Sequence, residues 1–557
     1  MDKKEIKKLI EKAILITQKE DKLPYFDIPE IIIEFPDRAE HGDYSTNIAF
    51  LISKIIKKPP QFISTIIKEE LQDMFGDSVT VLPPGFINFK VSKDELLDSL
   101  KEIIKKGAKY GRQKQGKTVV IDYSAPNIAK PFGIGHLRST IIGQALYNIY
   151  QFLGWKCIGD SHLGDWGTQF GKLIVAIKKW WKKDLEKLTI DDLESLYIRF
   201  HTESESDKTL IDEAREWFKK LEQGNKEARK VWKFCVALSS KEFDRIYKML
   251  GIKIDYALGE AFYEDKMADV LEEVEKLGLA KKSQGALVIP IEGINTPLML
   301  LKSDGTTTYE TRDLATSKYR KNKWNPDLLI YEVGADQKYY FTKVFKVSEM
   351  LGYGKKEQYV HIAHGLIRWP HSKLSTRKGN TVHLEDVLNQ ATKRAGEITQ
   401  DKDIAKQVGI GAVKYNDLSR HYSRDIVFDL DKMITLEGNS GPYIQYTAVR
   451  CKSVIKKAKA ERKNKRFRIA SFNKEEETVL RALRKFPEII QQAADNFSPN
   501  LVCNFVFDLA QKYNLFYEKN PILSAESKNF RIALTKAVLQ LLENSLNLLG
   551  IEIPEKM

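Results

Sequence analysis

The alternation of apolar and polar residues divides the chain into three stretches of different character. In residues 1–107 a helical apolar period comes first, and the apolar run 31–36 predicts a strand. A loop then enters a second helix, with Asp43 or Ser45 as its expected N-cap, and Pro and Gly precede an alternating strand within 82–92. This order predicts a small α+β domain that ends at a basic, glycine-containing linker.

The middle stretch, residues 108–430, has the pattern of a parallel sheet. The compact apolar run 119–123 is stopped by Pro126, a helix with one broad apolar face follows Gly135, and 155–160 has the pattern of the next strand. Strand, helix and strand in this order form a βαβ unit, which is the start of a nucleotide-binding sheet.

Apolar runs closed by glycine indicate that this sheet resumes at 326–334 and 359–365. Residues from about 180 to 300 are charged and mostly helical in pattern, with one β-like patch at 285–301. We therefore expect a Rossmann-like α/β domain with an inserted helical region. Long apolar stripes of helical period dominate 431–557, which predicts an all-α bundle.

Composition narrows the class of protein. The 557 residues exceed what one hydrophobic core usually supports, and 90 Lys+Arg against 76 Asp+Glu give a formal charge of +14, which favours a polyanionic partner. The N-terminal residues mix acids with bases, unlike a signal or transit peptide, and no apolar run has the length of a membrane span. Four scattered cysteines form no C-x-x-C pair, which indicates a reducing compartment, the cytoplasm: Cys157, Cys235, Cys451 and Cys503.

The loop 131–138 lies between a predicted strand end and a predicted helix start. This is a phosphate-binding position in open α/β sheets, because backbone N–H groups and the helix dipole favour an anion. Gly133 and Gly135 would let a nucleotide approach the backbone, and His136 could donate a hydrogen bond to it. A glycine turn with a structural histidine explains the same residues.

A dinucleotide-binding fingerprint, G-x-G-x-x-G, is the main rival interpretation of this loop. It requires Gly at position 138, where Arg138 would crowd the helix–strand contact. Asp160, after the next strand, suits the acid that binds a ribose, so the loop alone leaves this rival open.

The distant segment 372–380 distinguishes the two interpretations. It places Lys373, Arg377 and Lys378 in one glycine-flanked loop. An adenylating enzyme needs such cations because negative charge shifts to the departing pyrophosphate, whereas a dehydrogenase does not. A solvated run of charges is the structural alternative for this segment.

These motifs resemble those of the class I aminoacyl-tRNA synthetases. Residues 133–136 are similar to the H-x-G-H signature, with Gly133 in place of the first histidine, and 373–377 are similar to the K-M-S-K-S loop, with Thr376 in place of the second lysine. The longer blocks 124–143, 163–171 and 41–47 resemble arginyl-tRNA synthetases in particular, as does the S-T-R-K-G-N form of the second loop.

The resemblance implies that ATP, carrying Mg²⁺ on its triphosphate, converts L-arginine into arginyl-adenylate, from which the arginyl group passes to the 3′-terminal ribose of tRNA(Arg). It also implies a need for bound tRNA in arginine activation, which the residues themselves do not show. The implied catalytic residues are His136 and the cations Lys130, Lys373, Arg377 and Lys378, and the implied ATP-binding residues are Gly133, Gly135, His136 and Ser375.

The amino-acid substrate can also be considered from side-chain chemistry. A guanidinium needs an in-plane carboxylate with acceptors nearby. Tyr309 and Asp313, four residues apart, would share a helix face, although an ordinary helix start with a surface acid has the same spacing. The family carries its guanidinium-recognising residues on such a Y-x-x-x-D pattern, adds a glutamine that corresponds to Gln337, and by resemblance holds the α-amino end with Asp122 and Asn127. No editing domain is expected, because lysine would leave buried acceptors unpaired.

The C-terminal helices resemble the DALR anticodon-binding domain, although Arg481 stands where the name of the pattern has Asp, and residues 1–107 resemble an additional tRNA-contacting domain. Aromatic residues and arginine within 440–450 suit unstacked RNA bases, whereas packing between domains explains each of them equally well. The candidate tRNA-binding residues are Tyr443, Gln445, Tyr446 and Arg450.

The sequence is therefore interpreted as an arginine-charging synthetase, a cytoplasmic monomer with no membrane or DNA partner and no protein-held metal. His361, His364 and His371 lack a fourth ligand at zinc-site spacing, so we expect structural roles, and His162 is a further candidate for the border of the substrate site. A class I synthetase for glutamate or cysteine would need other groups in place of Tyr309 and Asp313. An NAD-dependent enzyme and a non-catalytic tRNA-binding protein are alternatives from other classes.

Overall fold

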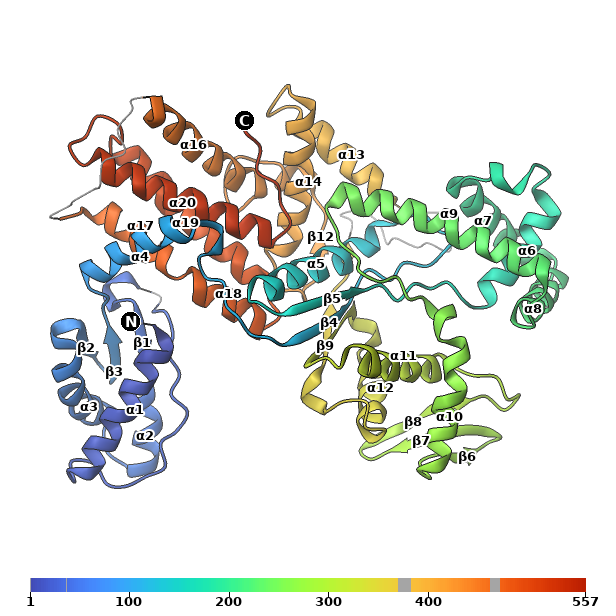
Figure 1. Cartoon of the computed structure of the whole chain (residues 1–557), viewed down its shortest axis with the longest axis horizontal. Coiled ribbons are helices and arrows are strands. Elements are labelled where there is room, and N and C mark those ends of the chain that lie inside the picture. Colours follow the sequence, from blue (N-terminus) through green and yellow to red (C-terminus); the bar gives the residue numbers. More distant parts are fainter. Residues whose placement is uncertain (1, 37, 369–381, 461–470) are drawn as a thin grey trace. The chain divides into compact units, whose positions relative to one another are not determined.

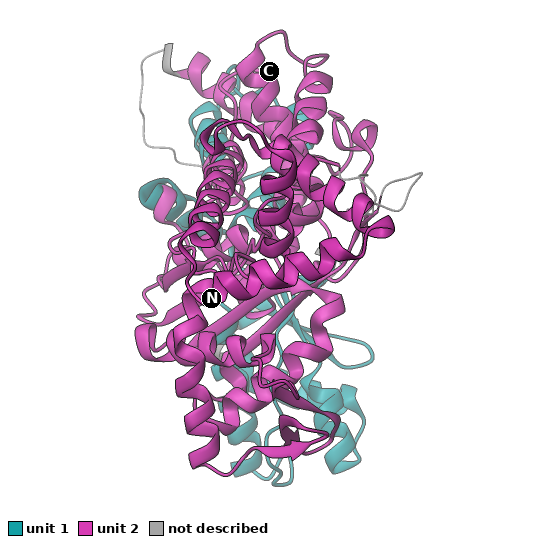
Figure 2. Cartoon of the chain, turned by 90° about the vertical axis from the view of Figure 1, so that its right-hand side faces the viewer, with its two compact units in different colours: residues 1–107, 464–485, 515–537 teal, residues 108–463, 486–514, 538–557 magenta. Residues whose placement is uncertain are grey.

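The computed structural model describes residues 2–36, 38–368, 382–460 and 471–557, and the chain forms two compact units (Figures 1 and 2). Unit 1 consists of Met1–Gly107, Asn464–Lys485 and Leu515–Ala537. Unit 2 consists of Ala108–Lys463, Phe486–Asn514 and Val538–Met557. Each unit therefore combines segments that are far apart in the sequence.

The first segment of unit 1 is an α+β structure. Its antiparallel sheet has the strand order β1-β3-β2. Phe89 of the central strand β3 lies opposite Tyr44 of β1 on one side and opposite Val79 of β2 on the other. A reciprocal capping box between Ser92 and Glu95 fixes the start of the last helix. The elements are α1 (Lys3–Lys19), β1 (Tyr44–Thr46), α2 (Ile48–Ile56), α3 (Pro60–Phe75), β2 (Val79–Leu82), β3 (Phe86–Phe89) and α4 (Lys93–Lys106).

Two local predictions for this segment are wrong. The run 31–36 forms no strand, because only Glu34 pairs, through a single bridge to Ser45. The residue before α2 is Asn47, which makes no side-chain cap. Asp43 instead accepts a hydrogen bond from the backbone N–H of Val91, at 2.7 Å.

A later helix of unit 1, α17 (Lys474–Arg484), is attached to this segment by arginine side chains. The Arg481 guanidinium donates to the Asp43 carboxylate, and the Arg484 guanidinium lies 5.6 Å from the centre of the Tyr44 ring. The arginine in place of the expected Asp is therefore a structural residue of unit 1.

A four-stranded parallel sheet lies at the centre of unit 2, in the order β10-β9-β4-β5. The side chains of Val119, Val120 and Ile121 in β4 are fully buried, as expected for a strand that is covered on both faces. Helix α5 (Leu137–Phe152) packs against three of the strands (Figure 1). The strands are β4 (Thr118–Asp122), β5 (Lys156–Asp160), β9 (Leu328–Gly334) and β10 (Tyr359–His364).

The inserted region between β5 and β9 is mainly helical and contains an antiparallel sheet in the order β6-β7-β8, as its pattern predicts. This sheet shares a hydrophobic core with α10, α11 and α12. The elements are α6 (Thr168–Trp180), α7 (Ile190–Ser206), α8 (Thr209–Glu222), α9 (Lys226–Leu250), α10 (Met267–Lys276), β6 (Lys281–Ser283), β7 (Ala286–Ile291), β8 (Ile294–Leu301) and α11 (Tyr309–Trp324). Helix α12 (Lys338–Met350) joins β9 to β10.

In the described residues after β10, the regular structure is helical apart from one short parallel strand pair. The pair is β11 (Ile367–Arg368) with β12 (Ile426–Val427). The helices are α13 (Leu384–Ala395), α14 (Lys402–Leu418), α15 (Leu430–Met433), α16 (Gly441–Ala460), α18 (Phe486–Asp495), α19 (Asn500–Lys519) and α20 (Lys528–Leu548), and α19 and α20 each contribute to both units. No helix in the described ranges has the length and apolar character needed to cross a membrane.

Candidate active site

The loop between β4 and α5 holds the predicted nucleotide-binding residues. A 3₁₀ turn at Ile134–His136, preceded by Gly133, leads directly into α5. A Cβ added at Gly135 would meet nothing within 4 Å, so the backbone is open to a ligand there. The structure thus brings Gly133, Gly135 and His136 together at a helix N-terminus, where unpaired N–H groups favour phosphate.

The imidazole of His136 is neutral at physiological pH. Burial, together with the ammonium of nearby Lys130, lowers the pKa of His136 to about 4. The ring packs against Phe132, with centroids 5.3 Å apart, and its Nδ1 has no hydrogen-bond partner among the described residues. A neutral ring with one unused nitrogen can hydrogen-bond a ligand oxygen without titrating between pH 5 and 8.

Four of the predicted site residues, Lys373, Ser375, Arg377 and Lys378, lie outside the described residues, but the chain on both sides of them reaches the start of α5. On the downstream side, the Ile134 N–H donates to the Val382 carbonyl at 3.0 Å, and the Leu384 N–H donates to the Phe132 carbonyl at 2.9 Å. These hydrogen bonds place the downstream flank of the predicted cationic loop on the nucleotide loop itself.

The upstream flank is β11, which is fixed by its pairing with β12. Arg138, one residue into α5, donates to the Arg424 carbonyl at 2.7 Å, just before β12. The same guanidinium is 1% exposed and lies 3.2 Å from the Asp417 carboxylate of α14. Arg138 therefore joins α5 to α14 and to the residues just before β12, the strand that pairs with the upstream flank.

Tyr309 and Asp313 occupy the first two turns of α11, as predicted. The Asp313 carboxylate accepts a hydrogen bond from the Tyr340 hydroxyl of α12 and lies 3.6 Å from Nε2 of His162. Tyr309 is 61% exposed, and a Cβ added at Gly167 would lie 4.0 Å from its hydroxyl oxygen. Asp313 is thus partly enclosed by other elements, and Tyr309 lies at the exposed side of the same helix face.

Asp313 belongs to an acidic cluster that the sequence did not reveal, formed with Glu260, Glu264 and Asp165. Burial raises the pKa of each of these carboxyls, to about 7 for Glu260 and Glu264, although Arg312 lowers it for both. The Arg312 guanidinium lies 3.1 Å from Glu260 and 3.9 Å from Glu264. Arg312 thus pairs with Glu260 and Glu264, whereas Asp313 has only the His162 imidazole as an ion-pair partner at contact distance among the described residues. The Asp313 end of the cluster can therefore accept a further cation.

The predicted α-amino ligands lie at the end of β4 and just beyond it. Asp122 is the last residue of the strand, and its charge contributes to the raised pKa of Asp313, so the two carboxylates are close enough to interact. Asn127 is exposed and pairs through its backbone with Gly164, and Gln337 is exposed at the end of the 3₁₀ turn after β9. The structure places all three at the carboxyl ends of neighbouring strands, where ligands bind in such sheets.

Asp160 does not serve as a ribose-binding acid. It is 0% exposed and pairs with the fully buried guanidinium of Arg320, at 2.8 Å. The same guanidinium is 2.8 Å from Asp122. The dinucleotide-binding interpretation requires a glycine at position 138 and a free acid to bind the ribose. The chain has Arg138 at the first position, and Asp160 is not free, so both features are missing.

Family models match nearly the whole chain. The model "tRNA synthetases class I (R), catalytic domain" matches residues 99–430, the "DALR anticodon binding domain" matches 444–557, and the "Arginyl tRNA synthetase N terminal domain" matches 3–91. The arginine–tRNA ligase of Clostridioides difficile (strain 630) is 41% identical over 543 residues, which cover 95% of this chain and 96% of that protein. The corresponding protein of Halothermothrix orenii is 41% identical over 558 residues and covers 98% of both chains.

This chain belongs to the arginyl-tRNA synthetase family. The arginyl-tRNA synthetase of Plasmodium falciparum has the same fold, with a TM-score of 0.84 at 26% identity, over 100% of this chain and 99% of that one. The Thermus thermophilus arginyl-tRNA synthetase, at 22% identity, agrees in fold with a TM-score of 0.85 over the full length of both chains. The predicted family and fold class are confirmed.

The histidines of β10 in this synthetase have structural partners. His361 Nε2 is 3.1 Å from the Val333 carbonyl, and His364 Nδ1 is 2.9 Å from the buried Glu332 carboxylate. His371 lies outside the described residues. Within the described ranges, no group of three or more His, Cys, Asp or Glu side chains is arranged to hold a metal ion.

The candidate tRNA-binding residues of α16 fall into two groups. Tyr446 is half-buried beneath the Arg450 guanidinium, and Asn514 of α19 hydrogen-bonds both Arg450 and the Tyr443 hydroxyl. Gln445 is 0% exposed, and its amide donates to the carbonyls of Gln407 and Glu552. A side chain in that position cannot reach RNA, so packing, the alternative that the sequence left open, is the role that the structure supports for Gln445.

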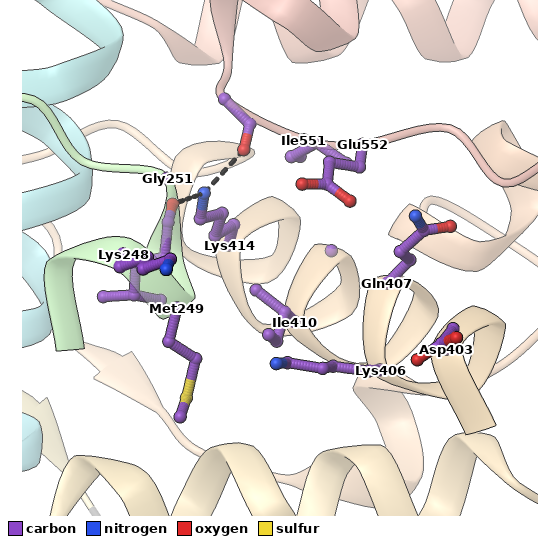
Figure 3. A pocket seen from close by; sticks show the side chains of 13 residues that line it. Lys248, Met249, Gly251, Asp403, Lys406, Gln407, Ile410, Lys414, Ile551 and Glu552 are labelled. Atoms are coloured by element: carbon purple, nitrogen blue, oxygen red, sulfur yellow. Dashed lines mark hydrogen bonds between the residues drawn. The ribbon is translucent and has the colours of Figure 1, made fainter. Parts of the chain in front are cut away.

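A further buried cation, Lys414, lines a cavity of about 410 Å³ between α9, α14 and the C-terminal residues (Figure 3). Burial lowers the pKa of Lys414 to about 8. Its ammonium donates to the Leu250 carbonyl, at the last residue of α9, and to the Gly550 carbonyl just after α20, at 2.5 Å for the latter. Lys414 thus joins the ends of two helices, each of which carries partial negative charge.

Proposed function

We propose that this synthetase joins L-arginine to tRNA(Arg) in two steps, through arginyl-adenylate. The observation that carries the choice of amino acid is the acidic cluster around Asp313, which lies close enough to Asp122 at the end of β4 for the two carboxylates to interact. A guanidinium presents a planar set of donors that carboxylates bind in pairs. The ammonium of lysine has fewer donors and would leave acceptors of a partly buried cluster unpaired. Family membership supports the same substrate.

In the proposed complex the two ends of arginine are held separately. Asp313 binds the guanidinium, with Tyr309 and Gln337 as further partners, and Glu260 adds negative charge from the inserted region. Asp122 and Asn127 hold the α-amino group at the end of β4. This arrangement directs the carboxylate of arginine to the nucleotide loop.

The first step is an in-line attack by the arginine carboxylate on the α-phosphorus of ATP, with pyrophosphate as the leaving group. No covalent enzyme intermediate is needed, because the enzyme acts by positioning and by charge stabilisation. Gly133 and Gly135 admit the nucleotide and His136 hydrogen-bonds it. Lys130, Lys373, Arg377 and Lys378 neutralise charge on the triphosphate, whose Mg²⁺ supplies further positive charge, and the Ser375 hydroxyl contributes to ATP binding.

In the second step a hydroxyl of the 3′-terminal ribose of tRNA attacks the carbonyl carbon of arginyl-adenylate, so that an ester bond forms, the bond to the phosphate breaks and AMP leaves. We assign tRNA contacts to residues 1–107 and to the helical region 431–557, with the catalytic domain at 108–430 and its insertion at about 180–300. On α16, Tyr446, Arg450 and Tyr443 supply aromatic and cationic groups. The enzyme acts as a monomer in the cytoplasm, where ATP and tRNA are present and its four free cysteines stay reduced.

Charging of total tRNA with each of the twenty amino acids in turn, followed by sequencing of the charged tRNA, tests the proposal. Arginine alone should be attached, and the charged species should be arginine isoacceptors. Charging with glutamate or cysteine would overturn the assignment of the acidic cluster, and an absence of charging with any amino acid would overturn the ligase activity.

A further inference from the structure

Three neighbouring strands present polar side chains at the same level of the parallel sheet. Asp160 at the end of β5, Asp122 at the end of β4 and Tyr331 in β9 are partners in register. Residues in register on adjacent parallel strands project from the same face of a sheet. The two carboxylates and the phenol ring therefore form one row on that face.

Arg320 of α11 lies across this row. Its Nη2 is 2.8 Å from oxygens of both Asp122 and Asp160, its Nε is 3.0 Å from Asp160, and its Cζ lies 5.1 Å from the centre of the Tyr331 ring. The Arg320 and Asp160 side chains are 0% exposed, and that of Asp122 is 8% exposed. Helix α11 is thus docked onto the sheet through one buried guanidinium.

The same helix carries Asp313 two turns before Arg320. Residues seven apart lie on nearly the same helix face, so a shift of Arg320 along the row would move Asp313 with it. Asp313 and Asp122 are the groups assigned above to the two ends of arginine. The separation between those groups is therefore fixed by where Arg320 sits.

We propose that Arg320 is a positioning residue for arginine, holding the Asp122 side chain in place for the α-amino group and fixing the distance from Asp122 to the guanidinium-binding Asp313. This inference rests on the proposed roles of Asp122 and Asp313. Without the guanidinium, two buried carboxylates on adjacent strands would face each other with no cation between them, and the unpaired side chains would no longer be held in their present positions. Burial already raises the pKa of Asp160 even with Arg320 present.

The decisive measurement compares arginine with 5-guanidinopentanoate, which is arginine without its α-amino group. With tRNA and ATP present, Arg320→Ala should raise the arginine KM about 100-fold, since a buried hydrogen-bonded charge pair loses its partner. The inhibition constant of 5-guanidinopentanoate should change less than threefold, because that ligand does not use Asp122. About 10 mM guanidinium chloride, far below denaturing concentrations, should restore arginine binding by occupying the vacated site.

Lys321→Ala is the matched control, because this half-buried neighbour on α11 has its ammonium paired locally with Asn325, away from the row of Asp122, Asp160 and Tyr331. It should leave both constants unchanged. If Arg320→Ala does not fold, Arg320→Lys decides the question: one ammonium cannot bridge both carboxylates as the fork does, so the arginine KM should rise about tenfold with the analogue unaffected. An equal loss for both ligands, or an arginine KM within twofold of wild type, would overturn the inference.

Asp122→Asn separates this inference from the proposed function. Asp122→Asn could raise the arginine KM without changing the inhibition constant of 5-guanidinopentanoate, while the Arg320 variants change neither constant. In that case the positioning role of Arg320 is wrong and the assignment of Asp122 to the α-amino group stands. If Asp122→Asn also affects both ligands equally, the assignment of Asp122 to the α-amino group is wrong.

Discussion

Replacement of Asp313 by asparagine tests the arginine site most directly. The substitution keeps the size of the side chain and an acceptor for the Tyr340 hydroxyl, but it removes the negative charge. The Asp313 side chain is 22% exposed, and three other carboxyls of the acidic cluster remain, so the loss should be smaller than for a fully buried pair. We take about 3 kcal/mol, at the low end for a broken buried ion pair.

A loss of this size corresponds to a rise of roughly 100-fold in the arginine KM, because each 1.4 kcal/mol is a factor of ten. The KM for ATP should stay within threefold, since the nucleotide loop is a separate segment. Citrulline, the neutral analogue in which an oxygen replaces one guanidinium nitrogen, should become a relatively better competitor, because the asparagine amide can donate to that oxygen.

ATP–pyrophosphate exchange in the presence of tRNA measures both constants. Asp304→Asn, in the exposed turn before α11, is the matched control and should behave as wild type. An unchanged arginine KM in Asp313→Asn, or a rise shared equally by ATP, would remove Asp313 from the arginine site.

The other predictions concern protons, the nucleotide loop and the buried lysine. Burial raises the pKa of Glu260 to about 7, and a bound guanidinium favours the ionised carboxylate, so Glu260 should release up to half a proton when arginine binds at pH 7, and binding should weaken as pH falls below 7. Calorimetry in two buffers of different ionisation enthalpy should show this release, and Glu260→Gln should reduce it, with Glu264 as the remaining cluster carboxyl whose pKa is about 7. Heats of binding that do not depend on the buffer would contradict the prediction. His136→Ala should lower pyrophosphate exchange about 10²–10³-fold with an unchanged circular dichroism spectrum, as for the loss of one preorganised donor, and wild-type exchange would refute its role. Lys414→Met should lower the free energy of unfolding by about 2 kcal/mol in urea titrations, because two helix-end carbonyls lose their donor. The control is Lys406→Met, at an exposed lysine that lines the same cavity, and it should change the free energy of unfolding by less than about 0.5 kcal/mol. Equal effects of the two substitutions would show that the two helix ends do not depend on Lys414.

Local sequence patterns predicted the parts of the fold that depend on neighbours in the chain. The strand, helix and strand around Gly135 are present, because a buried strand and a helix face each leave a short-range apolar period. The pattern failed at 31–36, where Ile31 and Ile33 are buried and Ile32 is exposed, as in a strand. Strand formation also needs a partner backbone, and only Glu34 has one.

The candidate site was predictable where one motif carries it, and was missed where distant residues meet. The spacing of Tyr309 and Asp313 predicted their shared helix face. Glu260 comes from the inserted region, and only the tertiary fold brings it close to Asp313. His162 was a candidate for the border of the substrate site because it follows a predicted strand, but the sequence did not indicate that it would lie 3.6 Å from Asp313. For Asp160 the sequence suggested a ligand role that the structure does not support. Its position after a strand suited an acid that binds a ribose, whereas its carboxylate is paired with the buried Arg320.

The discontinuity of unit 1 has a consequence for synthesis on the ribosome. Two of its three segments come after residue 463, so the α+β segment is finished long before α17 exists. At roughly 5–20 residues per second, the delay is on the order of tens of seconds. During that time Asp43 and Tyr44 lack their contacts with Arg481 and Arg484. The nascent N-terminal segment therefore has to remain soluble before the other two segments of unit 1 have been made. A fragment that ends at Gly107 would never acquire the two later segments of unit 1.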